Sequence, residues 1–350
     1  MFYHFLPQGI YADQFINFMR SNKKEIFNNH VFLFLSHGEK EENVTFSAND
    51  SKNVFTFFSI LKFFLCLKKN DRIIIHNYSH PYLYFASACC WWKLNNVAWL
   101  VWGGDLFFFN IVKNLKYKFY EMFRKIAIKR FAYIITYGSE YDLAKKYYNA
   151  KGKVLHFLYP MSFFKMPECQ NKESIFILVG NSRSVSNEHI EALKLLAKFK
   201  DENIKVFVPL SYGECPSGYV ESIDKLGTEI FGEKYIPIKT MMDLRIYQEF
   251  LATIDIMVCN HRRQEAWGTI FALLLNHKKV FVRKETPTNI DFTSFGLKFF
   301  LTDDVSSMTF DEFKYFNEVD GRSNEKILMR MFSKESLIDI WNNIFTDMLN

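Results

Sequence analysis

Short β-rich apolar runs alternate with helical patterns along most of the chain. In the first half, the strand-like runs are 31–35, 72–76, 97–102 and 133–137, and the helical segments are 13–20, 54–67, 81–93 and 115–130. This alternation predicts βαβ units, and therefore a parallel sheet covered by helices on both faces.

The same alternation begins again after Pro160. Strands are expected at 175–180, 204–209, near 229–231, 256–259 and 279–283, and helices at 187–199, 218–226, 241–252 and 268–276. A chain of 350 residues fits two medium domains better than one, because single cores stop growing at roughly 250–300 residues. We therefore expect an α/β protein with two doubly wound domains, 1–160 and 161–325, and a helix in 326–350 that packs back on the first.

Composition limits the function classes. Charged residues make up 23% and hydrophobic residues 49%, which excludes intrinsic disorder. The net charge of 44 − 38 = +6 suits an anionic ligand or an anionic bilayer and is small for a nucleic-acid binder. The six cysteines form no CxxC pair, so we expect no zinc site or disulfide framework and a reducing, cytoplasmic location. The longest apolar stretch, 54–67, is shorter than the roughly 20 residues that span a bilayer, and we expect no signal peptide at the N-terminus.

Two turns of the second half have features of ligand sites. The strand 175–180 ends in Gly180-Asn181-Ser182, and a helix opens at Asn187-Glu188-His189. Backbone N–H groups at such a turn bind anions, because a helix N-terminus carries partial positive charge. The alternative is an ordinary capped βα connection, with His189 as a surface histidine rather than a phosphate donor.

The second turn follows the strand 256–259. Arg262 and Arg263 precede Glu265, and Gly268-Thr269 then opens an apolar helix. Arginines placed here are bidentate donors for a diphosphate, and Glu265 could accept from sugar hydroxyls. The alternative is a solvated basic loop. Open α/β sheets bind ligands beyond the carboxyl ends of their strands, which both turns satisfy.

Two residues of the first half are candidates for acid–base chemistry. Asp105 follows the strand 97–102 and two glycines, and His76 ends the strand 72–76. A carboxylate or imidazole at this edge can act as a general base if it reaches the reacting hydroxyl. The alternatives are that Asp105 caps a helix and that His76 is a buried histidine with satisfied hydrogen bonds.

Several of these blocks resemble one enzyme family. They are Ile177-Leu178-Val179-Gly180-Asn181-Ser182, Ser186-Asn187-Glu188-His189-Ile190, Val208-Pro209 with Tyr212, Arg263-Gln264 with Gly268-Thr269, and Trp102-Gly103-Gly104-Asp105-Leu106, with His76 and Pro81 in register. Together they resemble glycosyltransferase family 56, whose members transfer 4-acetamido-4,6-dideoxygalactose in enterobacterial common antigen synthesis. The blocks are collinear from about residue 76 to the helix at Gly268.

The resemblance implies a GT-B fold, two Rossmann-like domains with the active site in the cleft between them. It implies a dTDP-sugar donor, a polyprenyl-diphosphate-linked acceptor of O-antigen or common antigen synthesis, and no metal cofactor. The family lacks the DxD metal motif of other transferase folds, and Asp303-Asp304, in a late loop, matches no such site. The donor would be held by Gly180, Asn181, Ser182, Asn187, Glu188, His189, Tyr212, Arg263, Glu265, Gly268 and Thr269, and Asp105 would be the base, with His76 second.

A lipid-linked acceptor implies contact with the anionic inner face of a bacterial inner membrane. The segments 54–67 and 115–131 combine large apolar side chains with Lys and Arg, as membrane-surface helices do. The alternative is that their aromatic residues fill the core. Two other function classes stay open: a nucleotide-sugar epimerase, and a non-catalytic sugar-nucleotide-binding subunit of a polysaccharide assembly complex. Nucleic-acid binding is least favoured.

Overall fold

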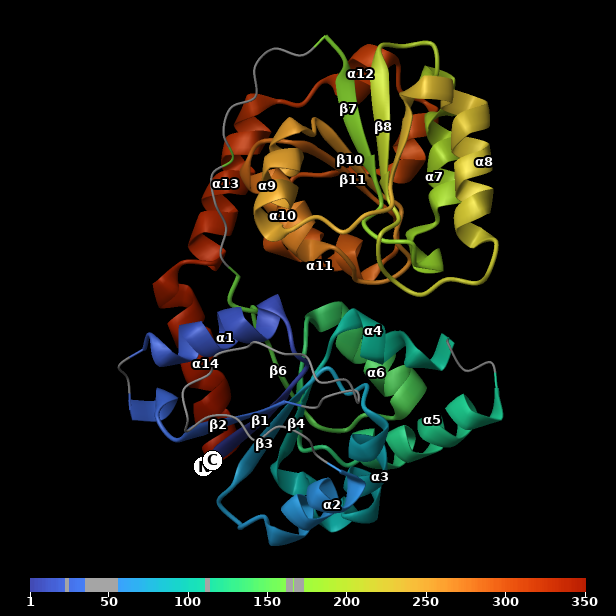
Figure 1. The fold of residues 1–350 in the computed structure, drawn as a ribbon. Helices are drawn as coiled ribbons and strands as arrows, with labels where there is room; N and C mark the ends of the chain where they lie inside the picture. The colour runs from blue at the N-terminus through green and yellow to red at the C-terminus, as the bar shows by residue number, and fades with distance from the viewer. Residues whose placement is uncertain (23–24, 35–55, 111–113, 162–165, 167–172) are drawn as a thin grey trace. The chain divides into compact units, whose positions relative to one another are not determined.

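The computed structural model describes residues 1–22, 25–34, 56–110, 114–161, 166 and 173–350. The chain forms two compact units. Unit 1 comprises Met1–Ser162 together with Met331–Asn350, and unit 2 comprises Phe163–Arg330. Each unit has its own parallel sheet (Figure 1).

Unit 1 contains a six-stranded sheet in the order β2-β1-β3-β4-β5-β6, in which every pair is parallel. The strands are β1 (Phe2–Leu6), β2 (His30–Phe34), β3 (Arg72–His76), β4 (Val97–Leu100), β5 (Tyr133–Ile135) and β6 (Lys153–Leu155). The chain runs from β1 to β2 on one side and then continues on the other side with β3. The strand order therefore reverses between β1 and β3, which is where ligands bind in sheets of this kind.

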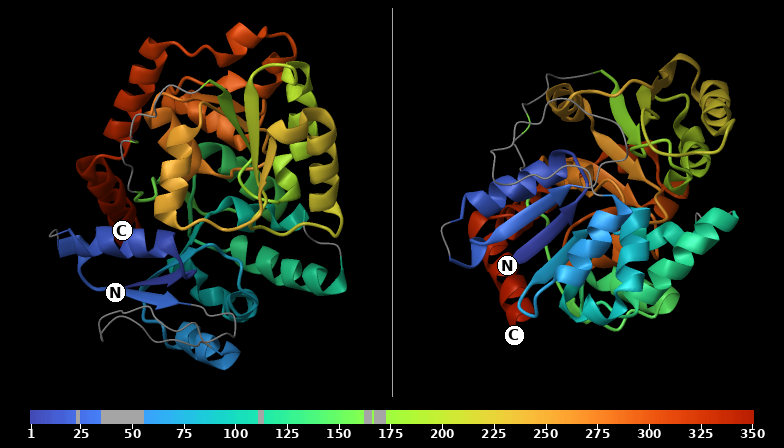
Figure 2. Two further views of the ribbon diagram at one scale, coloured as in Figure 1. Left: turned by 45° about the horizontal axis from the view of Figure 1, so that its top comes forward. Right: turned by 60° about the horizontal axis from the view of Figure 1, so that its bottom comes forward.

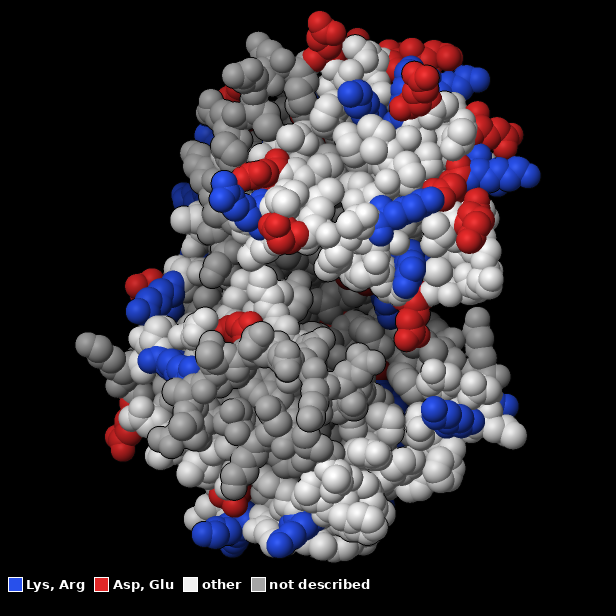
Figure 3. Space-filling view, viewed as in Figure 1, with Lys and Arg blue, Asp and Glu red and all other residues white. Residues whose placement is uncertain are grey.

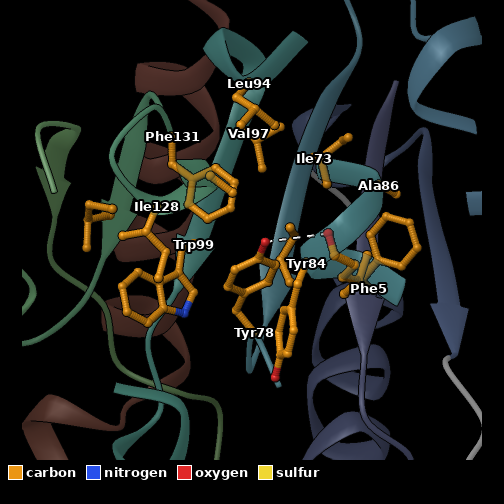
Figure 4. Packing of buried hydrophobic residues seen from close by; sticks show 14 of the residues in the cluster. Phe5, Ile73, Tyr78, Tyr84, Ala86, Leu94, Val97, Trp99, Ile128 and Phe131 are labelled. Atoms are coloured by element: carbon orange, nitrogen blue, oxygen red, sulfur yellow. Dashed lines mark hydrogen bonds between the residues drawn. The ribbon is translucent and has the colours of Figure 1, made fainter. Parts of the chain in front are cut away.

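Helices cover both faces of this sheet (Figure 2). They are α1 (Ile10–Arg20), α2 (Phe57–Cys66), α3 (Pro81–Cys89), α4 (Gly103–Leu106), α5 (Leu115–Ile128), α6 (Gly138–Tyr148) and α14 (Lys334–Leu349), with short 3-10 turns η1 (Glu25–Phe27), η2 (Trp91–Asn96) and η3 (Phe107–Asn110). Successive strand residues point to opposite faces of a sheet. Phe5, labelled in Figure 4, and Ile75 therefore join the core under α2, α3 and α5. His4 and His76 contact Phe15 of α1 on the other face.

The C-terminal helix α14 is part of unit 1. Its Trp341 is fully buried against Phe15, and the indole Nε1 donates to the backbone oxygen of Leu158 at 3.1 Å. At the end of the helix, the Arg72 guanidinium donates to the backbone oxygen of Met348. The last 20 residues thus complete the hydrophobic face that β1, β3 and α1 begin.

Unit 2 contains a second parallel sheet in the order β12-β11-β10-β7-β8-β9. Its strands are β7 (Ile175–Val179), β8 (Ile204–Pro209), β9 (Tyr235–Ile238), β10 (Ile256–Cys259), β11 (Lys279–Val282) and β12 (Phe300–Leu301). The chain runs from β7 to β8 and β9, then returns to the other side of β7 with β10. The reversal point of this sheet therefore lies between β7 and β10.

The helices of unit 2 also form two layers. They are α7 (His189–Leu196), α8 (Tyr219–Phe231), α9 (Leu244–Thr253), α10 (Trp267–Leu275), α11 (Pro287–Phe295), α12 (Phe310–Lys314) and α13 (Glu318–Met331). Leu193 of α7 and Ile223 of α8 pack on Val179 and Val206 in one core. Phe250 of α9 contacts Phe207 on the opposite face. Both units are therefore doubly wound α/β domains, as the sequence predicts.

Some predicted elements differ from the structure. Residues 229–231 are the last turn of α8 and not a strand, because Ile223, Gly227 and Phe231 recur every four residues and form the buried face of one helix. The predicted C-terminal helix is two helices, α13 and α14, separated at Ser333, whose side chain caps α14 by accepting from the backbone N–H of Ser336. The start of the predicted helix 54–67 lies outside the described residues.

Across the described part of the chain, no helix is both long enough and apolar enough to cross a bilayer.

Candidate functional site

The turn after β7 is built around a glycine and an asparagine. Gly180 has φ +69°, and a Cβ there would lie 2.6 Å from Oδ1 of Asn187. The buried Asn187 accepts hydrogen bonds from the backbone N–H groups of Asn181, at 2.7 Å, and Ser182, at 3.4 Å. These two N–H groups, predicted from sequence to bind an anion, therefore donate to a side chain of the same loop.

Glu265 joins this turn to the loop after β10. Its Oε2 accepts from Asn187 Nδ2 at 3.0 Å, and its Oε1 accepts from the Ser186 hydroxyl and from Nε of Arg263. The sequence offered Glu265 as an acceptor for sugar hydroxyls. In the structure, its carboxylate accepts hydrogen bonds from three groups of the protein itself. These bonds hold the loop after β7 against the loop after β10, at the reversal point of the sheet.

A second link involves Arg262 and Glu188. The Arg262 guanidinium lies 2.5 Å from Glu188 Oε1, and its side chain is 61% exposed. The backbone N–H of Arg262 also donates to the Ser186 oxygen at 2.9 Å. Glu188 has φ +51° and directly precedes α7. Both arginines of the predicted site therefore lie at one sheet edge, each held by a carboxylate.

Helix α10 begins at the same edge. Ala266 precedes it with φ +60°, and no side chain caps its first N–H groups in the described structure. Gly268 lies in its first turn, where it adds no side chain over these N–H groups. The Thr269 hydroxyl lies 2.9 Å from the hydroxyl of Tyr247, so it is bonded to α9.

His189 and Tyr212 complete the set of predicted donor-site residues. His189 is fully buried, with Nδ1 3.2 Å from the Tyr219 hydroxyl, so it is not the surface histidine of the alternative reading. Burial and the neighbouring His261 lower the pKa of His189 to about 4, so it is neutral at pH 7 and offers no charge to a phosphate. Tyr212 is half-exposed, and its hydroxyl accepts from Asn181 Nδ2 at 2.7 Å.

Asp105 occupies a buried cap in unit 1. Its Oδ2 accepts from Trp99 Nε1 and from the backbone N–H of Tyr78, both at 2.6 Å, and its Oδ1 accepts from the backbone N–H of Trp102 at 2.8 Å. Burial raises the pKa of Asp105 to about 6, although Arg124 and the three N–H donors oppose this. The carboxylate is 1% exposed. These contacts favour the helix-cap alternative, and the general-base assignment gains no support from them.

Arg124 of α5 lies beneath this cap and is completely buried. Its guanidinium donates to the backbone oxygens of Tyr78 and Asp105 and pairs with Glu121. Tyr78, whose place in the core Figure 4 shows, also stacks with the guanidinium at 5.2 Å. Arg124 belongs to the segment 115–131, which the sequence predicts to contact the membrane. For this residue the prediction is wrong, because its side chain is buried.

His76, the second candidate base, is also buried. Its Nε2 lies 3.0 Å from His4 Nδ1, and His4 Nε2 lies 2.8 Å from His30 Nδ1. Burial lowers the pKa of His76 to about 3, so the ring is neutral at pH 7. Its partners His4 and His30 were not predicted, because they come from other strands and carry no local motif.

Asp303 and Asp304 lie in the turn η7 (Thr302–Ser306), away from the loops after β7 and β10 in the chain. Within the described ranges, no group of three or more His, Cys, Asp or Glu side chains is arranged to hold a metal ion.

Comparison with known proteins identifies the family. Residues 19–345 match the family described as 4-alpha-L-fucosyltransferase glycosyl transferase group 56. The chain belongs to glycosyl transferase group 56. It is therefore a glycosyltransferase of the hexosyltransferase type, as the sequence resemblance predicts, rather than an epimerase or a non-catalytic subunit.

Several solved structures have the same arrangement of elements. OtsA superposes with a TM-score of 0.66 at 9% identity, covering 99% of this chain and 98% of that one. Sucrose-phosphate synthase from Thermosynechococcus elongatus gives the same TM-score, identity and coverage. A glycosyltransferase from Rickettsia africae gives a TM-score of 0.63 at 13% identity and covers 100% of this chain and 98% of that one. The fold is GT-B, as predicted.

Proposed function

We propose that this glycosyltransferase moves a 4-acetamido-4,6-dideoxyhexose from a dTDP-sugar to a polyprenyl-diphosphate-linked glycan in O-antigen or enterobacterial common antigen synthesis. The family description names a fucosyltransferase. A fucosyl residue is a 6-deoxyhexose, which is the class of sugar that the proposal names.

The observation that carries the donor half of the proposal is the start of α10. The N-terminal end of a helix carries partial positive charge, and this helix begins where the strand order reverses, between β7 and β10. Arg262 and Arg263 lie in the turn that leads to it. This arrangement suits a nucleoside diphosphate, whose two phosphates carry the negative charge of the donor.

The same groups favour catalysis in this proposal. When the anomeric bond breaks, the leaving dTDP gains negative charge. Arginine and helix N–H groups already in place stabilise that charge without rearrangement, which is commonly the largest catalytic contribution. The proposal assigns charge neutralisation to these groups rather than to a divalent cation, and turnover is expected to be unchanged by EDTA.

The acceptor half is supported by one surface of unit 1, here called the basic aromatic face. It is formed by α2, α3, η2 and α5. Its exposed large apolar residues are Phe58, Leu65, Tyr82, Trp91, Trp92, Leu115, Phe119 and Met122, and its exposed cations are Lys62, Lys68, Lys69, Lys116, Lys118, Lys125, Lys129 and Arg130. Over α5, basic side chains stand on an otherwise uncharged surface in Figure 3.

Ring contacts show that the basic aromatic face is continuous. Phe57 of α2 contacts Phe58 beside it and Phe85 of α3, and Phe85 contacts Phe119 of α5 at 5.6 Å between ring centroids. Arg130, just beyond α5, lies over the Trp91 ring of η2 at 5.1 Å. The four elements therefore present one surface.

The distribution of charged residues supports one kind of partner for the basic aromatic face. Among residues 56–70, 81–96 and 114–130, the acidic residue is Glu121, which is buried and paired with Arg124. Exposed aromatic side chains together with exposed cations, without exposed carboxylates, are typical of a surface that rests on anionic lipid. We propose that this face holds the enzyme on the inner face of the bacterial inner membrane, beside its lipid-linked acceptor.

A vesicle co-sedimentation assay tests the membrane proposal. The triple variant Lys116/Lys118/Lys125→Glu is compared with the matched control Lys194/Lys200/Lys225→Glu, which changes three exposed lysines of unit 2. The α5 variant is expected to lose binding to vesicles containing phosphatidylglycerol, and the control to retain it. Equal binding by both variants would remove the proposal.

A thermal-shift comparison of dTDP, UDP and GDP tests the donor class. We expect the largest stabilisation with dTDP, because a ligand that binds only the folded state raises the free energy of unfolding by RT ln(1 + [L]/Kd), which at equal concentration is greatest for the tightest ligand. A preference for UDP or GDP would contradict the dTDP assignment while leaving the transferase class intact.

A further inference from the structure

Three histidines of unit 1 form one hydrogen-bonded chain. His76 ends β3, His4 lies within β1, and His30 begins β2. His76 Nε2 lies 3.0 Å from His4 Nδ1, His4 Nε2 lies 2.8 Å from His30 Nδ1, and His30 Nε2 lies 2.8 Å from the backbone oxygen of Ile26.

The carbonyl of Ile26 fixes the direction of every bond in this chain. A carbonyl oxygen only accepts, so His30 Nε2 must carry the hydrogen. In a neutral imidazole the other nitrogen then accepts, so His30 Nδ1 accepts from His4 Nε2–H. By the same step, His4 Nδ1 accepts from His76 Nε2–H.

The series of hydrogen-bonded histidines therefore ends at a ring nitrogen that carries no hydrogen. His76 Nδ1 must be an acceptor, and within the described residues it has no hydrogen-bond partner, although His76 is only 1% exposed. Burial lowers the pKa of each of the three rings, which keeps the chain neutral. A buried polar atom without a partner costs about 1–3 kcal/mol, so such an atom calls for an explanation.

A second unpartnered atom lies in the same cluster. The Tyr159 hydroxyl is buried and, in the described structure, has no hydrogen-bond partner. The Tyr159 and His76 rings contact each other edge to face, with centroids 6.0 Å apart. One atom that must accept and one hydroxyl that can donate are complementary to a single guest hydroxyl, which both donates and accepts.

The surroundings suit a sugar. The cluster lies at the carboxyl end of β3, beside β1, where the strand order of unit 1 reverses. Tyr159 contacts Trp102, which follows β4, at 5.8 Å, and Tyr11 of α1 at 6.2 Å. Tyr11 is 43% exposed and is thus the exposed ring of this cluster. Aromatic walls around a few oriented polar atoms are usual in small-molecule sites.

We propose that His76 Nδ1 and the Tyr159 hydroxyl together bind one hydroxyl group of the acceptor glycan, and that His4 and His30 are positioning residues that hold His76 in its accepting tautomer. The identity of the acceptor rests on the proposed function. The hydrogen-bonding site itself rests on the three-histidine chain and the two unpartnered atoms.

The direct test is a ¹⁵N spectrum of histidine-labelled protein at pH 7, with the three resonances assigned from single substitutions. His4, His30 and His76 are expected to be neutral and protonated on Nε2. Addition of a prenyl-diphosphate-linked N-acetylhexosamine glycan, or of the free N-acetylhexosamines at high concentration, is expected to move the Nδ1 resonance of His76. His277, exposed in unit 2 and paired with Glu325, should not respond.

Two results would overturn the inference. One is His76 protonated on Nδ1, because the chain would then run in the opposite direction. The other is the expected tautomer with no response to any glycan, which would show that the two atoms do not bind a glycan hydroxyl.

A kinetic test separates a role in acceptor binding from a purely structural role of these residues. Tyr159→Phe keeps the ring and removes the hydroxyl, and His4→Phe removes the bond that orients His76. Each is expected to raise the KM for the acceptor at least tenfold and to leave the KM for the donor unchanged. Equal changes in both constants would indicate a purely structural role. Should the glycolipid not serve as an acceptor for the wild type, the proposed function fails, and the spectra with free sugars still decide this inference.

Discussion

Asn187 Nδ2 donates to Glu265 Oε2 at 3.0 Å, and this bond joins the loop after β7 to the loop after β10. The two strands are neighbours at the reversal point of the sheet in unit 2. Asn187 also holds the backbone N–H of Asn181, so one buried side chain orders both loops of the candidate donor site. This relationship gives the loops the rigidity that a preorganised diphosphate site needs.

Asn187→Ala is expected to weaken dTDP binding about tenfold or more and to lower the free energy of unfolding by about 1–3 kcal/mol, because buried partners lose their hydrogen bonds. Titration calorimetry and urea denaturation measure the two effects. Asn203→Ala, an exposed asparagine in the loop before β8, is the matched control and should show neither. Unchanged dTDP affinity in Asn187→Ala would separate this loop from the donor site.

Arg263→Ala is expected to weaken dTDP binding by roughly 10–100-fold, since a charge-assisted hydrogen bond to phosphate is worth about 1.5–3 kcal/mol. Arg245→Ala on α9 removes a comparable cation from an exposed ion pair with Glu249 and should not change affinity. If the two variants bind dTDP equally well, the loop after β10 does not hold the diphosphate.

Asp105→Ala is expected to destabilise unit 1 by about 3 kcal/mol or more, because it leaves Trp99 Nε1 and the N–H groups of Tyr78 and Trp102 without an acceptor. Asp105→Asn, which keeps one acceptor oxygen, should lose less. Urea denaturation is compared with turnover in both variants. An Asp105→Ala protein of wild-type stability that has lost transfer would instead restore Asp105 as the general base.

Stability is expected to depend on pH through the histidine chain. Burial lowers the pKa of His30 to about 4 and of His76 to about 3, whereas the unfolded value is about 6.5. Between pH 6.5 and 4 the unfolded chain therefore binds more protons. The free energy of unfolding, fully present above pH 6.5, should fall by about 1.4 kcal/mol per pH unit for each histidine as pH decreases.

Urea denaturation of the wild type and of His76→Phe across pH 4.5–7.5 measures this dependence. In the variant, the free energy of unfolding should fall less steeply with decreasing pH than in the wild type, by about the 1.4 kcal/mol per pH unit expected for one histidine. The pKa of Asp105 is raised by burial, so below pH 6 this group increases the free energy of unfolding as pH decreases. Because Asp105 is present in both proteins, its effect cancels in the comparison. Identical slopes would mean that His76 is not buried and neutral.

Strands and sheet type were the most predictable features. β3, β8 and β10 have the predicted bounds, because continuous apolar runs between polar turns mark strands of a buried parallel sheet. β1 was not predicted, since it has a histidine at its centre and lies at the N-terminus. The end of α8 was wrongly assigned to a strand, because a short apolar run does not by itself reveal a helical face.

The candidate donor site was predictable in place and less so in detail. Loops after β7 and β10 were identified correctly as neighbours, because strand ends of a parallel sheet share an edge. The partners of Asn187 and Glu265 were not, since such bonds depend on the conformation of two loops distant in sequence. His4 and His30 were not predicted for the same reason, since they meet His76 from strands distant in sequence. The burial of Arg124 was not predictable either, because the helix that contains it carries several cations and the sequence does not show which of them faces the core.

The measurement that bears most directly on the account is transfer itself. The purified enzyme is incubated with a dTDP-4-acetamido-4,6-dideoxyhexose, with and without a prenyl-diphosphate-linked N-acetylhexosamine glycan, and the products are analysed by mass spectrometry. We expect a glycolipid heavier by one acetamido-dideoxyhexosyl residue, and release of dTDP only when the glycolipid is present. No transfer from this donor, together with transfer of another hexose from a UDP- or GDP-sugar, would contradict it.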